Sequence, residues 1–285
     1  MKKILSVAIA MLLALSLVAC GGDSSSAADS ASNAAGSGSS SASGSYATSL
    51  EDIKAKGQLV IGLDDTFAPM GFRDADGNLV GFDIDLATAV CAELGVEPVF
   101  QPIKWSAKEM ELSTGKVDCL WNGLSSTPER QETLSMSDAY LNNKIIVMTN
   151  KGVEIAAKED LANYNIGVQA ESSALEVVQA DDVYESIKDK ITEYDTYDQV
   201  VMDMQAGRLD AMIVDEVLGQ YKNTQLGDIF EVAPFDFGDD LYAIGFRKSD
   251  TELTGAVNDA LAACIENGKT AEISEKWFGE DIVLR

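Results

Sequence analysis

The stretch Gly115-Lys-Val-Asp-Cys-Leu-Trp-Asn-Gly123 occurs a second time, in altered form, as Gly207-Arg-Leu-Asp-Ala-Met-Ile-Val-Asp215. Each copy has a glycine, a basic residue, an apolar residue and an aspartate before a short apolar run. This pattern predicts the end of a helix, a glycine turn and a buried strand. Upstream residues match at the same spacing, with Trp105 in the position of Tyr197. The duplication predicts two similar α/β lobes, although a match of this length can also arise by chance.

Polar residues stand at the end of the apolar run in each copy. Asn122 and Gly123 end the first run, and Asp215 ends the second. In open α/β sheets, ligands bind beyond the carboxyl ends of the strands. Two lobes whose strand ends face each other form a cleft, so we expect the binding site to lie between them.

The amino-terminal residues predict export and lipid attachment. A basic start precedes the apolar run of residues 4–19, and Leu17-Val-Ala-Cys20 fits a lipobox. The alternative, a membrane-spanning helix, is disfavoured because such a helix needs roughly 20 apolar residues. We therefore expect residues 1–19 to be a cleaved signal peptide and Cys20 to be lipidated. The protein is then expected at the cell membrane, lipid-anchored, on the extracytoplasmic face.

The next segment predicts a tether, and the remainder predicts two lobes. Residues 20–49 start at the predicted lipid-bearing cysteine and consist almost wholly of Gly, Ser, Ala and Asp, a composition typical of flexible chain. The remaining length suits two lobes near the usual domain size. We expect residues 50–143 with 239–285 to form lobe one and residues 144–238 to form lobe two. The two crossings between them would act as a hinge.

The composition excludes several classes of function. The formal net charge is −26, from 21 basic and 47 acidic residues. Nucleic-acid binding is disfavoured because it requires a basic surface, and a solvated acidic surface suits an exported soluble body. The chain has no histidine, which excludes histidine-ligated metal and histidine-based catalysis. We expect no metal, no cofactor and a monomer.

Three cysteines follow the predicted lipid-attachment site. Cys91, Cys119 and Cys264 lie far apart, within apolar helix or strand patterns. An odd set leaves at least one free thiol, so a disulfide framework is not implied. We expect small buried hydrophobic side chains, and the pattern leaves open whether any two of them pair.

Strand and helix patterns alternate along both predicted lobes. In lobe one we expect strand 58–63, a hairpin turn at Asp76-Gly77, helix 83–94, strand 97–102, helix 107–113 and strand 117–121. In lobe two we expect strand 144–148, strand 164–168, a helix from 174 and strand 211–214; strand 241–246 and helices 251–265 and 270–277 then return to lobe one. This alternation predicts an α/β fold whose mostly parallel sheet has helices on both faces.

Several motifs resemble those of one protein family. The most specific is Asn122-Gly-Leu-Ser-Ser-Thr-Pro-Glu-Arg130, and the others are Gly81-Phe-Asp-Ile-Asp85, Ser135-Met-Ser-Asp-Ala-Tyr140, the duplicated stretch and Glu275-Lys-Trp-Phe-Gly279. Together they resemble the polar amino-acid binding proteins of ABC importers, solute-binding family 3, over residues 50 to 280. The resemblance implies a periplasmic-binding-protein-like type II fold that closes on a free amino acid and delivers it to an ABC permease. It implies no covalent chemistry.

The resemblance implies a carboxylate site around Arg130. The guanidinium is a planar fork of donors that suits a carboxylate, and Ser125 can add a donor. Residues alone leave another interpretation, a surface arginine in the helix-starting turn Thr127-Pro128-Glu129. In lobe two, Ser172 and Ser173 precede a helix and can supply backbone donors. The same two serines can also act as ordinary N-caps.

The resemblance implies an ammonium site around Asp215. This aspartate ends an apolar strand, where an unpaired buried carboxylate is costly. A ligand ammonium would be its partner, and the carbonyl of Gly123 would share that ammonium, with Asn122 beside it. The other interpretation of Asp215 is an N-cap for the helix that starts at Glu216.

Aromatic residues are expected to clasp the ligand side chain. Phe67 and Trp105 fall where the family has such residues, and their flat faces can stack on aliphatic or guanidinium groups; a place in the core is the alternative. The chain departs from some relatives at Gln169 and Ser173, where they have Lys and Gly. Trp121 stands where small residues are common, so the pocket is expected to be narrower or more polar.

Asp64 is the candidate for side-chain selectivity. It follows the first strand, and its carboxylate could meet the far end of a ligand that is stacked between Phe67 and Trp105. With Asp65 adjacent, this favours arginine, lysine or ornithine. Glutamine and cystine remain open, because a carboxylate also accepts amide or ammonium hydrogen bonds. Both acids can also be solvated turn residues.

Two other functions are compatible with the same fold. A few similar proteins are exported dehydratases, and fold does not determine function. The sequence offers no histidine and no matched acid–base pair for such an enzyme, and a lipid anchor suits a receptor better. A ligand sensor is the second alternative, although no signalling segment follows residue 285 in this sequence.

Overall fold

The computed structural model describes residues 49–285. The predicted signal peptide, the predicted lipid-attachment site Cys20 and nearly all of the predicted tether lie outside these residues. By their contacts, residues 49–285 lie within one compact unit. Within residues 49–285, no helix combines the length and the apolar character that crossing a membrane requires.

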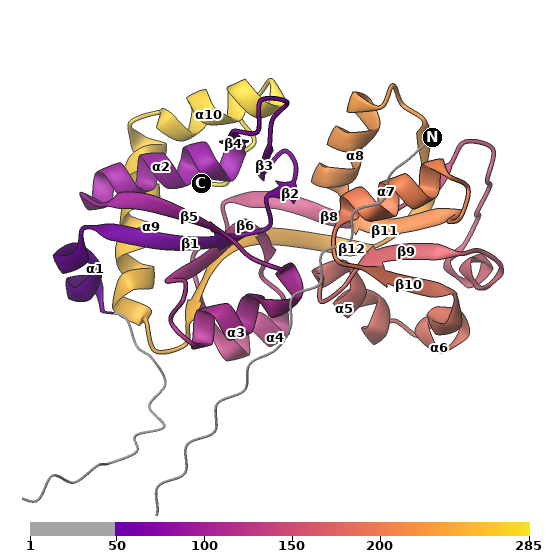
Figure 1. The fold of residues 1–285 in the computed structure, drawn as a ribbon, viewed down its shortest axis with the longest axis horizontal. Helices are drawn as coiled ribbons and strands as arrows, with labels where there is room; N and C mark the ends of the chain where they lie inside the picture. Colours follow the sequence, from indigo (N-terminus) through magenta and orange to yellow (C-terminus); the bar gives the residue numbers. More distant parts are fainter. Residues whose placement is uncertain (1–48) are drawn as a thin grey trace, which may run out of the picture. The chain divides into compact units, whose positions relative to one another are not determined.

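The described residues contain one large sheet and one small sheet. The strands of the large sheet are β1 (Gln58–Leu63), β5 (Glu97–Pro102), β6 (Cys119–Ser125), β7 (Leu134–Met136), β8 (Leu141–Asn150), β9 (Ile166–Gln169), β10 (Ile191–Tyr194), β11 (Ala211–Asp215) and β12 (Phe230–Arg247). Their order is β10-β9-β11-β8-β12-β6-β1-β5, and β7 pairs with β12 outside this path (Figure 1). The small sheet consists of β2 (Thr66–Phe67), β3 (Gly71–Arg73) and β4 (Leu79–Val80).

Helices connect these strands. They are α1 (Leu50–Lys56), α2 (Phe82–Leu94), α3 (Lys108–Ser113), α4 (Pro128–Thr133), α5 (Ser173–Ala180), α6 (Tyr184–Ile187), α7 (Tyr197–Gln205), α8 (Glu216–Gln225), α9 (Thr251–Glu266) and α10 (Lys269–Phe278). Short 3₁₀ segments are η1 (Trp105–Ala107), η2 (Lys158–Asn163) and η3 (Lys188–Lys190). We call the part built on β1, β5 and β6 lobe one, and the part built on β9, β10 and β11 lobe two.

In lobe one, helices cover both faces of the sheet. The strands β1, β5 and β6 run parallel, with α2 and α10 on one side and α3 on the other (Figure 1). Trp121 of β6 packs in the core on the α2 side, whereas its neighbours Leu120 and Leu124 pack with Leu112 of α3. Burial of both faces explains why these strands read as continuous apolar runs.

Lobe two repeats this arrangement. The strands β9, β10 and β11 run parallel. Met212 and Val214 of β11 pack in the core that contains residues of α7 and α8, whereas Ile213 packs with Leu175 and Val178 of α5. Each lobe is therefore a sheet with helices on both faces, as the sequence predicts.

The two lobes meet at the long strands β8 and β12. These strands are antiparallel, and their register pairs Leu141 with Tyr242 and Ile145 with Gly238. The prediction of a mostly parallel sheet is therefore wrong at the centre. The physical reason is connectivity, because a chain that crosses to lobe two on one strand must return on a strand of opposite direction.

Several predicted strand boundaries are also wrong, and the difference at β6 affects the candidate site. The sequence places the strand after Gly115 at residues 117–121, whereas β6 continues to Ser125. The extension arises because β12 pairs with Leu124 and Ser125, a contact with a segment far away in the sequence. Asn122 and Gly123 consequently lie inside the strand rather than beyond its carboxyl end.

The duplicated stretch has the same geometry in both lobes. Asp118 accepts a hydrogen bond from the backbone N–H of Val60 at 2.8 Å, and Asp210 accepts one from Asn165 at 2.8 Å. In each case the aspartate contacts the chain at the start of the neighbouring parallel strand. The preceding glycines have φ of 74° and 68°, in the left-handed region that favours glycine. The repeat therefore reflects structure and not chance.

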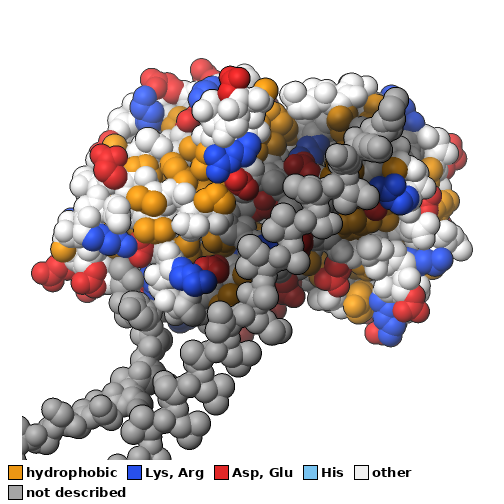
Figure 2. All heavy atoms as spheres, viewed as in Figure 1, with side chains coloured by type: hydrophobic (Ala, Val, Ile, Leu, Met, Phe, Trp, Pro, Cys, Tyr) orange, Lys and Arg blue, Asp and Glu red, His pale blue; other side chains and the backbone are white. Residues whose placement is uncertain are grey.

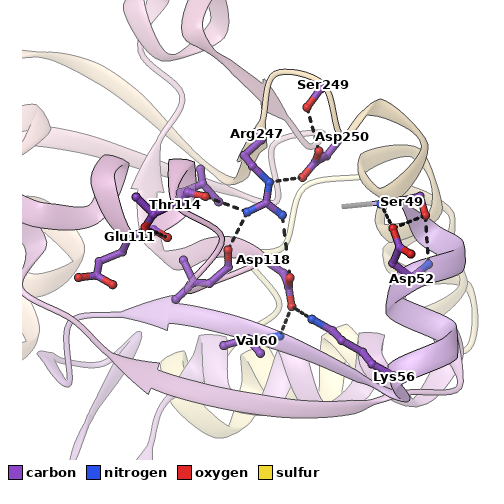
Figure 3. A network of polar contacts seen from close by, with 12 residues as sticks. Ser49, Asp52, Lys56, Val60, Glu111, Thr114, Asp118, Arg247, Ser249 and Asp250 are labelled. Atoms are coloured by element: carbon purple, nitrogen blue, oxygen red, sulfur yellow. Dashed lines mark hydrogen bonds and ion pairs between the residues drawn. The ribbon is translucent and has the colours of Figure 1, made fainter. Parts of the chain in front are cut away.

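In lobe one, Asp118 belongs to a larger polar network (Figure 3). It pairs with Lys56 of α1 and with Arg247, which also pairs with Asp250. The buried Arg247 guanidinium donates to the carbonyls of Leu112 and Val117, both at 2.8 Å. This network fastens the end of β12, and with it the returning carboxyl-terminal segment, to lobe one.

The surface agrees with the solvated character expected from the charge. Figure 2 shows acidic and basic side chains spread over the visible face, several of them next to one another, with neutral and hydrophobic side chains between them. Cys91, Cys119 and Cys264 are free thiols and are buried. The expectation of small buried hydrophobic cysteines is therefore confirmed.

Candidate functional site

The predicted ligand-binding residues are all buried, and they come from both lobes. Lobe one contributes Asp64, Phe67, Trp105, Asn122, Gly123, Ser125 and Arg130, and lobe two contributes Gln169, Ser172, Ser173 and Asp215. Buried polar side chains need partners, since an unmade hydrogen bond is costly away from water. The partners of these residues show how the two lobes meet.

Three of the polar contacts between the lobes involve predicted ligand-binding residues. The Gln169 side-chain amide donates to Asp64 at 2.7 Å. Ser125 Oγ lies 2.8 Å from Ser173 Oγ. Arg130 Nη2 donates to Glu176 of α5 at 3.2 Å. The predicted residues of the two lobes therefore face one another across a shared polar interface.

Arg130 is buried between the lobes, and its position follows from local structure. Thr127 caps α4 by accepting from the Arg130 N–H, so the predicted helix-starting turn is present. Instead of lying on the surface, the side chain is 2 % exposed and donates from Nη1 to the Ser125 carbonyl at 3.1 Å. Among residues 49–285, Arg130 Nε is a buried donor that has no hydrogen-bond partner.

Asp215 is a buried carboxylate at the end of β11. It accepts hydrogen bonds from Asn143 at 2.7 Å and from the Tyr242 hydroxyl at 2.9 Å. Although it precedes α8, its side chain makes no capping hydrogen bond to that helix. Burial, followed by the charge of Asp240, raises the pKa of Asp215 to about 7. A cation beside Asp215 would lower this pKa, because it would stabilise the charged carboxylate.

Two residues that the sequence did not single out join the carboxylate and ammonium candidates. Asn143 of β8 donates to Asp215 and also to Asp240 of β12 at 2.9 Å. Asp240 accepts from Ser125 Oγ at 2.6 Å, so Ser125 in turn accepts from Ser173 Oγ. Asn143 and Asp240 lie on the predicted crossings between the lobes. That position was the only feature of the sequence that could have identified them.

Gly123 occupies a position where a side chain would be strained. Its φ is 57°, and a side chain there would meet the rings of Phe67 and Tyr242 at 2.9 and 3.1 Å. Its N–H donates to Asp83 at 2.7 Å, and the Tyr140 hydroxyl donates to the same carboxylate. Burial raises the pKa of Asp83 to about 7. Asp83 therefore fixes the backbone at Gly123, next to the ring of Tyr242, whose hydroxyl donates to Asp215.

Of the two aromatic candidates, Phe67 lies at this interface, whereas Trp105 packs with Leu112 in a hydrophobic cluster of lobe one. Phe67 contacts Tyr197 of lobe two, with ring centroids 6.3 Å apart. Trp105 is buried, and the Lys108 ammonium lies 5.6 Å from its ring centroid. Trp121 instead packs against Tyr140 in the core of lobe one, with ring centroids 6.4 Å apart.

The remaining candidates position the loops around the site. Asn122 accepts from the Asp64 N–H at 3.2 Å. Ser172 caps α5 by accepting from Leu175 and donates to the Gln169 carbonyl at 2.7 Å, so its predicted N-cap role is confirmed. Within residues 49–285, no group of three or more Cys, Asp or Glu is arranged to hold a metal ion.

Two α/β lobes joined by a pair of crossing strands, with opposite charges buried between them, define a periplasmic-binding-protein fold of type II. The family model of the bacterial extracellular solute-binding proteins, family 3, matches residues 59–280. The chain belongs to this family.

Individual relatives agree with this assignment. The L-cystine-binding protein TcyJ of Escherichia coli K12 is 30 % identical over 239 residues, which cover 82 % of this chain and 87 % of that protein. The lysine/arginine/ornithine-binding periplasmic protein of the same strain is 31 % identical over 242 residues, covering 82 % and 90 %. The solved structure of an ABC uptake transporter substrate-binding protein from Streptococcus pneumoniae with bound histidine has 35 % identity and a TM-score of 0.78, and covers 82 % of this chain and 98 % of that one.

Proposed function

We propose that the protein is the substrate-binding component of an ABC importer, which closes on a free amino acid and delivers it to a permease. The observation that best supports this function is the burial of Arg130 in lobe one and Asp215 in lobe two, both at the interface between the lobes. The α-carbon of a free amino acid carries both an anionic carboxylate and a cationic ammonium. The two residues match those groups by charge.

The other predicted residues have complementary places in this proposal. Arg130 binds the ligand carboxylate, with Ser125, Ser172 and Ser173 as further donors. Asp215 binds the ammonium together with Gly123 and Asn122. Phe67, Trp105, Asp64 and Gln169 surround the side chain.

Closure is proposed to occur at the paired strands β8 and β12. The proposed boundaries are residues 50–143 with 239–285 for lobe one and 144–238 for lobe two. A ligand that contacts both lobes stabilises the closed state by its differential affinity for that state. The receptor is proposed to act as a monomer, held at the extracytoplasmic face of the membrane by lipid on Cys20.

A thermal-shift screen against the twenty amino acids and cystine tests the function. A ligand that binds the folded protein raises its melting temperature by mass action. At least one polar or cationic amino acid is expected to raise it, and calorimetry should then give a single site. A flat response to every compound would contradict the proposal.

The protein is proposed not to be an enzyme. No covalent step is assigned to Arg130 or Asp215, because their proposed roles are to bind the carboxylate and the ammonium of the ligand. Incubation with prephenate or arogenate, followed by chromatography, should therefore return the compound unchanged. Turnover would assign the site to a dehydratase instead.

Ligand closure is expected to change tryptophan fluorescence through Trp105. Trp105 is buried beside Lys108, which donates to lobe two, whereas the Trp277 indole N–H donates to Asp85 on the α10 side of lobe one at 2.8 Å. Trp105→Phe should remove most of the ligand-induced change, and Trp277→Phe should preserve it. A full signal in the Trp105→Phe protein would place this residue outside the binding site.

Lipid anchoring is expected to depend on Cys20, which lies outside the described residues. Cys20→Ala should abolish labelling by a fatty-acid probe and leave the protein uncleaved or released from the membrane fraction. Cys91→Ala is the matched control and should retain the label. Equal labelling of the Cys20→Ala protein would refute the anchor.

A further inference from the structure

Lys108 is a buried lysine at the lobe interface that the amino-acid site described above does not use. It is the first residue of α3 and is only 3 % exposed. Its ammonium donates to the backbone carbonyl of Glu171 in lobe two at 2.8 Å. That oxygen carries no formal charge, so the contact satisfies a hydrogen bond without balancing the cation.

The surroundings make this cation costly. Burial, followed by the neighbouring charge of Arg130, lowers the pKa of Lys108 to about 8. Both effects disfavour the charged form of the side chain, and they outweigh the charges of Glu109, Glu176 and Glu171, which favour it. A lysine that served only as packing would be replaceable by an apolar residue, so a buried ammonium here points to an anion that completes the site.

Asp64 of lobe one provides the opposite charge, and it contacts the same turn of lobe two as Lys108. Gln169 Nε2 donates to Asp64 at 2.7 Å, and Glu171, two residues further along, holds Lys108. Asp64 also accepts two hydrogen bonds from Thr66, at 2.9 and 2.7 Å. Because a carboxylate has about four acceptor positions, it can still accept from a ligand. One short turn thus contacts an acid and a base of lobe one.

These two charges accompany the two aromatic residues that are proposed to clasp the side chain. Asp64 precedes Phe67 by one short turn, and the Lys108 ammonium lies 5.6 Å from the Trp105 ring centroid. Since Asp64 and Lys108 contact the same turn of lobe two, a ligand side chain that lies against Phe67 can reach both charges. The charge on that end decides which ligands fit.

Simple side chains satisfy only half of this arrangement. The cationic end of arginine or lysine suits Asp64 but meets a buried ammonium at Lys108. The anionic end of glutamate suits Lys108 but meets a buried carboxylate at Asp64. A neutral amide balances neither charge. An end group with an ammonium and a carboxylate satisfies both residues.

We propose that Asp64 and Lys108 recognise a second amino-acid head group, so that the ligand is a diamino-dicarboxylic acid such as cystine or diaminopimelate. This inference rests on the proposed function, because the first head group occupies Arg130 and Asp215. Asp64 binds the second ammonium, and Lys108 binds the second carboxylate. The ligand then spans the interface with a zwitterion at each end.

Calorimetric titration of the wild-type mature chain is the first test. L-cystine, meso-diaminopimelate, arginine, glutamate and glutamine are compared under identical conditions, after removal of any co-purified ligand by unfolding and refolding. A diamino-dicarboxylic acid should bind at least about tenfold more tightly than the other three. Tighter binding of arginine, glutamate or glutamine would overturn the proposal but leave the amino-acid receptor intact. Failure of all five, together with a flat thermal-shift screen, would contradict the proposed function itself.

Two substitutions locate the second head group. Lys108→Met should weaken the diamino-dicarboxylic acid by about tenfold or more and improve arginine relative to it, because the buried cation is gone. Asp64→Asn should weaken the same ligand and improve glutamate relative to it. Opposite changes in selectivity would indicate that the two charges bind the same end group of the ligand.

Lys104→Met is the matched control, because Lys104 also pairs across the lobes, with Asp195, yet its side chain is 67 % exposed. It should leave every affinity within about threefold, as expected for an exposed pair. If Lys108→Met weakens all five ligands equally, Lys108 only holds the lobes together and the proposal is wrong. Lys108→Gln, with circular dichroism and melting temperatures for each protein, distinguishes misfolding from lost recognition.

Discussion

Replacing Arg130 with alanine is expected to cost about 2–5 kcal/mol of amino-acid binding free energy, the scale for truncating one partner of a buried charge pair. The guanidinium is buried, fixed by the Ser125 carbonyl and Glu176, and retains a donor at Nε. Its loss leaves the ligand carboxylate in a dry site without a counter-charge. Isothermal titration calorimetry of the wild type and the variant measures the difference.

Two further variants make this experiment specific. Arg130→Lys should also bind poorly, because one ammonium does not reproduce the planar fork. Arg208→Ala is the matched control: Arg208 pairs with Asp203 in lobe two, and its side chain is 62 % exposed, so binding should be unchanged. Normal affinity in a folded Arg130→Ala protein would show that the carboxylate site is elsewhere.

Asp215→Asn is expected to produce a loss of similar size, about 2–5 kcal/mol. Asparagine has nearly the same shape and can still contact Tyr242 and Asn143, so the fold should persist. The change removes the negative charge that the proposal pairs with the ligand ammonium. Asp239→Asn is the control, because the side chain of Asp239 is 93 % exposed. Equal affinities for wild type and Asp215→Asn would remove Asp215 from the site.

The affinity of the wild-type protein is expected to fall as the pH drops below about 7. Burial first, then Asp240, raises the pKa of Asp215 to about 7 in the ligand-free protein, and Tyr242 and Asn143 are the other groups that face it. A proton then competes with the ligand ammonium for the carboxylate. Titrations from pH 5 to 8 should show this dependence in the wild type and a flatter profile in Asp215→Asn.

The same pKa shift has an opposite consequence for the ligand-free protein. Because the folded protein holds the Asp215 proton more tightly than the unfolded chain, this group stabilises the fold at low pH. Its contribution to the free energy of unfolding is lost as the pH rises towards about 7. A ligand cation offsets the loss. Melting temperatures of the wild type and Asp215→Asn, with and without ligand, measure both effects.

Local patterns in the sequence were sufficient to predict many of the secondary-structure elements. The strands β1 and β5 have the bounds predicted from their apolar runs, because residues within the strands and turns beside them set those limits. The end of β6 was misplaced because pairing with β12 extends it. Strand direction at β8 and β12 likewise depends on a crossing that local patterns do not reveal.

The candidate site divides in the same way. Arg130 and Asp215 were predicted because their motifs resemble those of a known family. Lys108 and Asn143 were not singled out, since each looks like an ordinary polar residue in a helix or strand pattern. Their importance comes from contacts with lobe two or with β12, which are remote in the sequence.

The sequence by itself determined the acidic character, the duplicated α/β units, most helices and strands, and the chemical types available for a ligand. These properties follow from composition and from neighbours a few residues apart. Only the tertiary structure decided which charges lie together, including Asp215 beside the half-buried Asp240, and Asp64 and Lys108, which both contact one turn of lobe two. Burial and long-range pairing arise when distant segments exclude water from a shared interface, and that interface exists only in the folded chain.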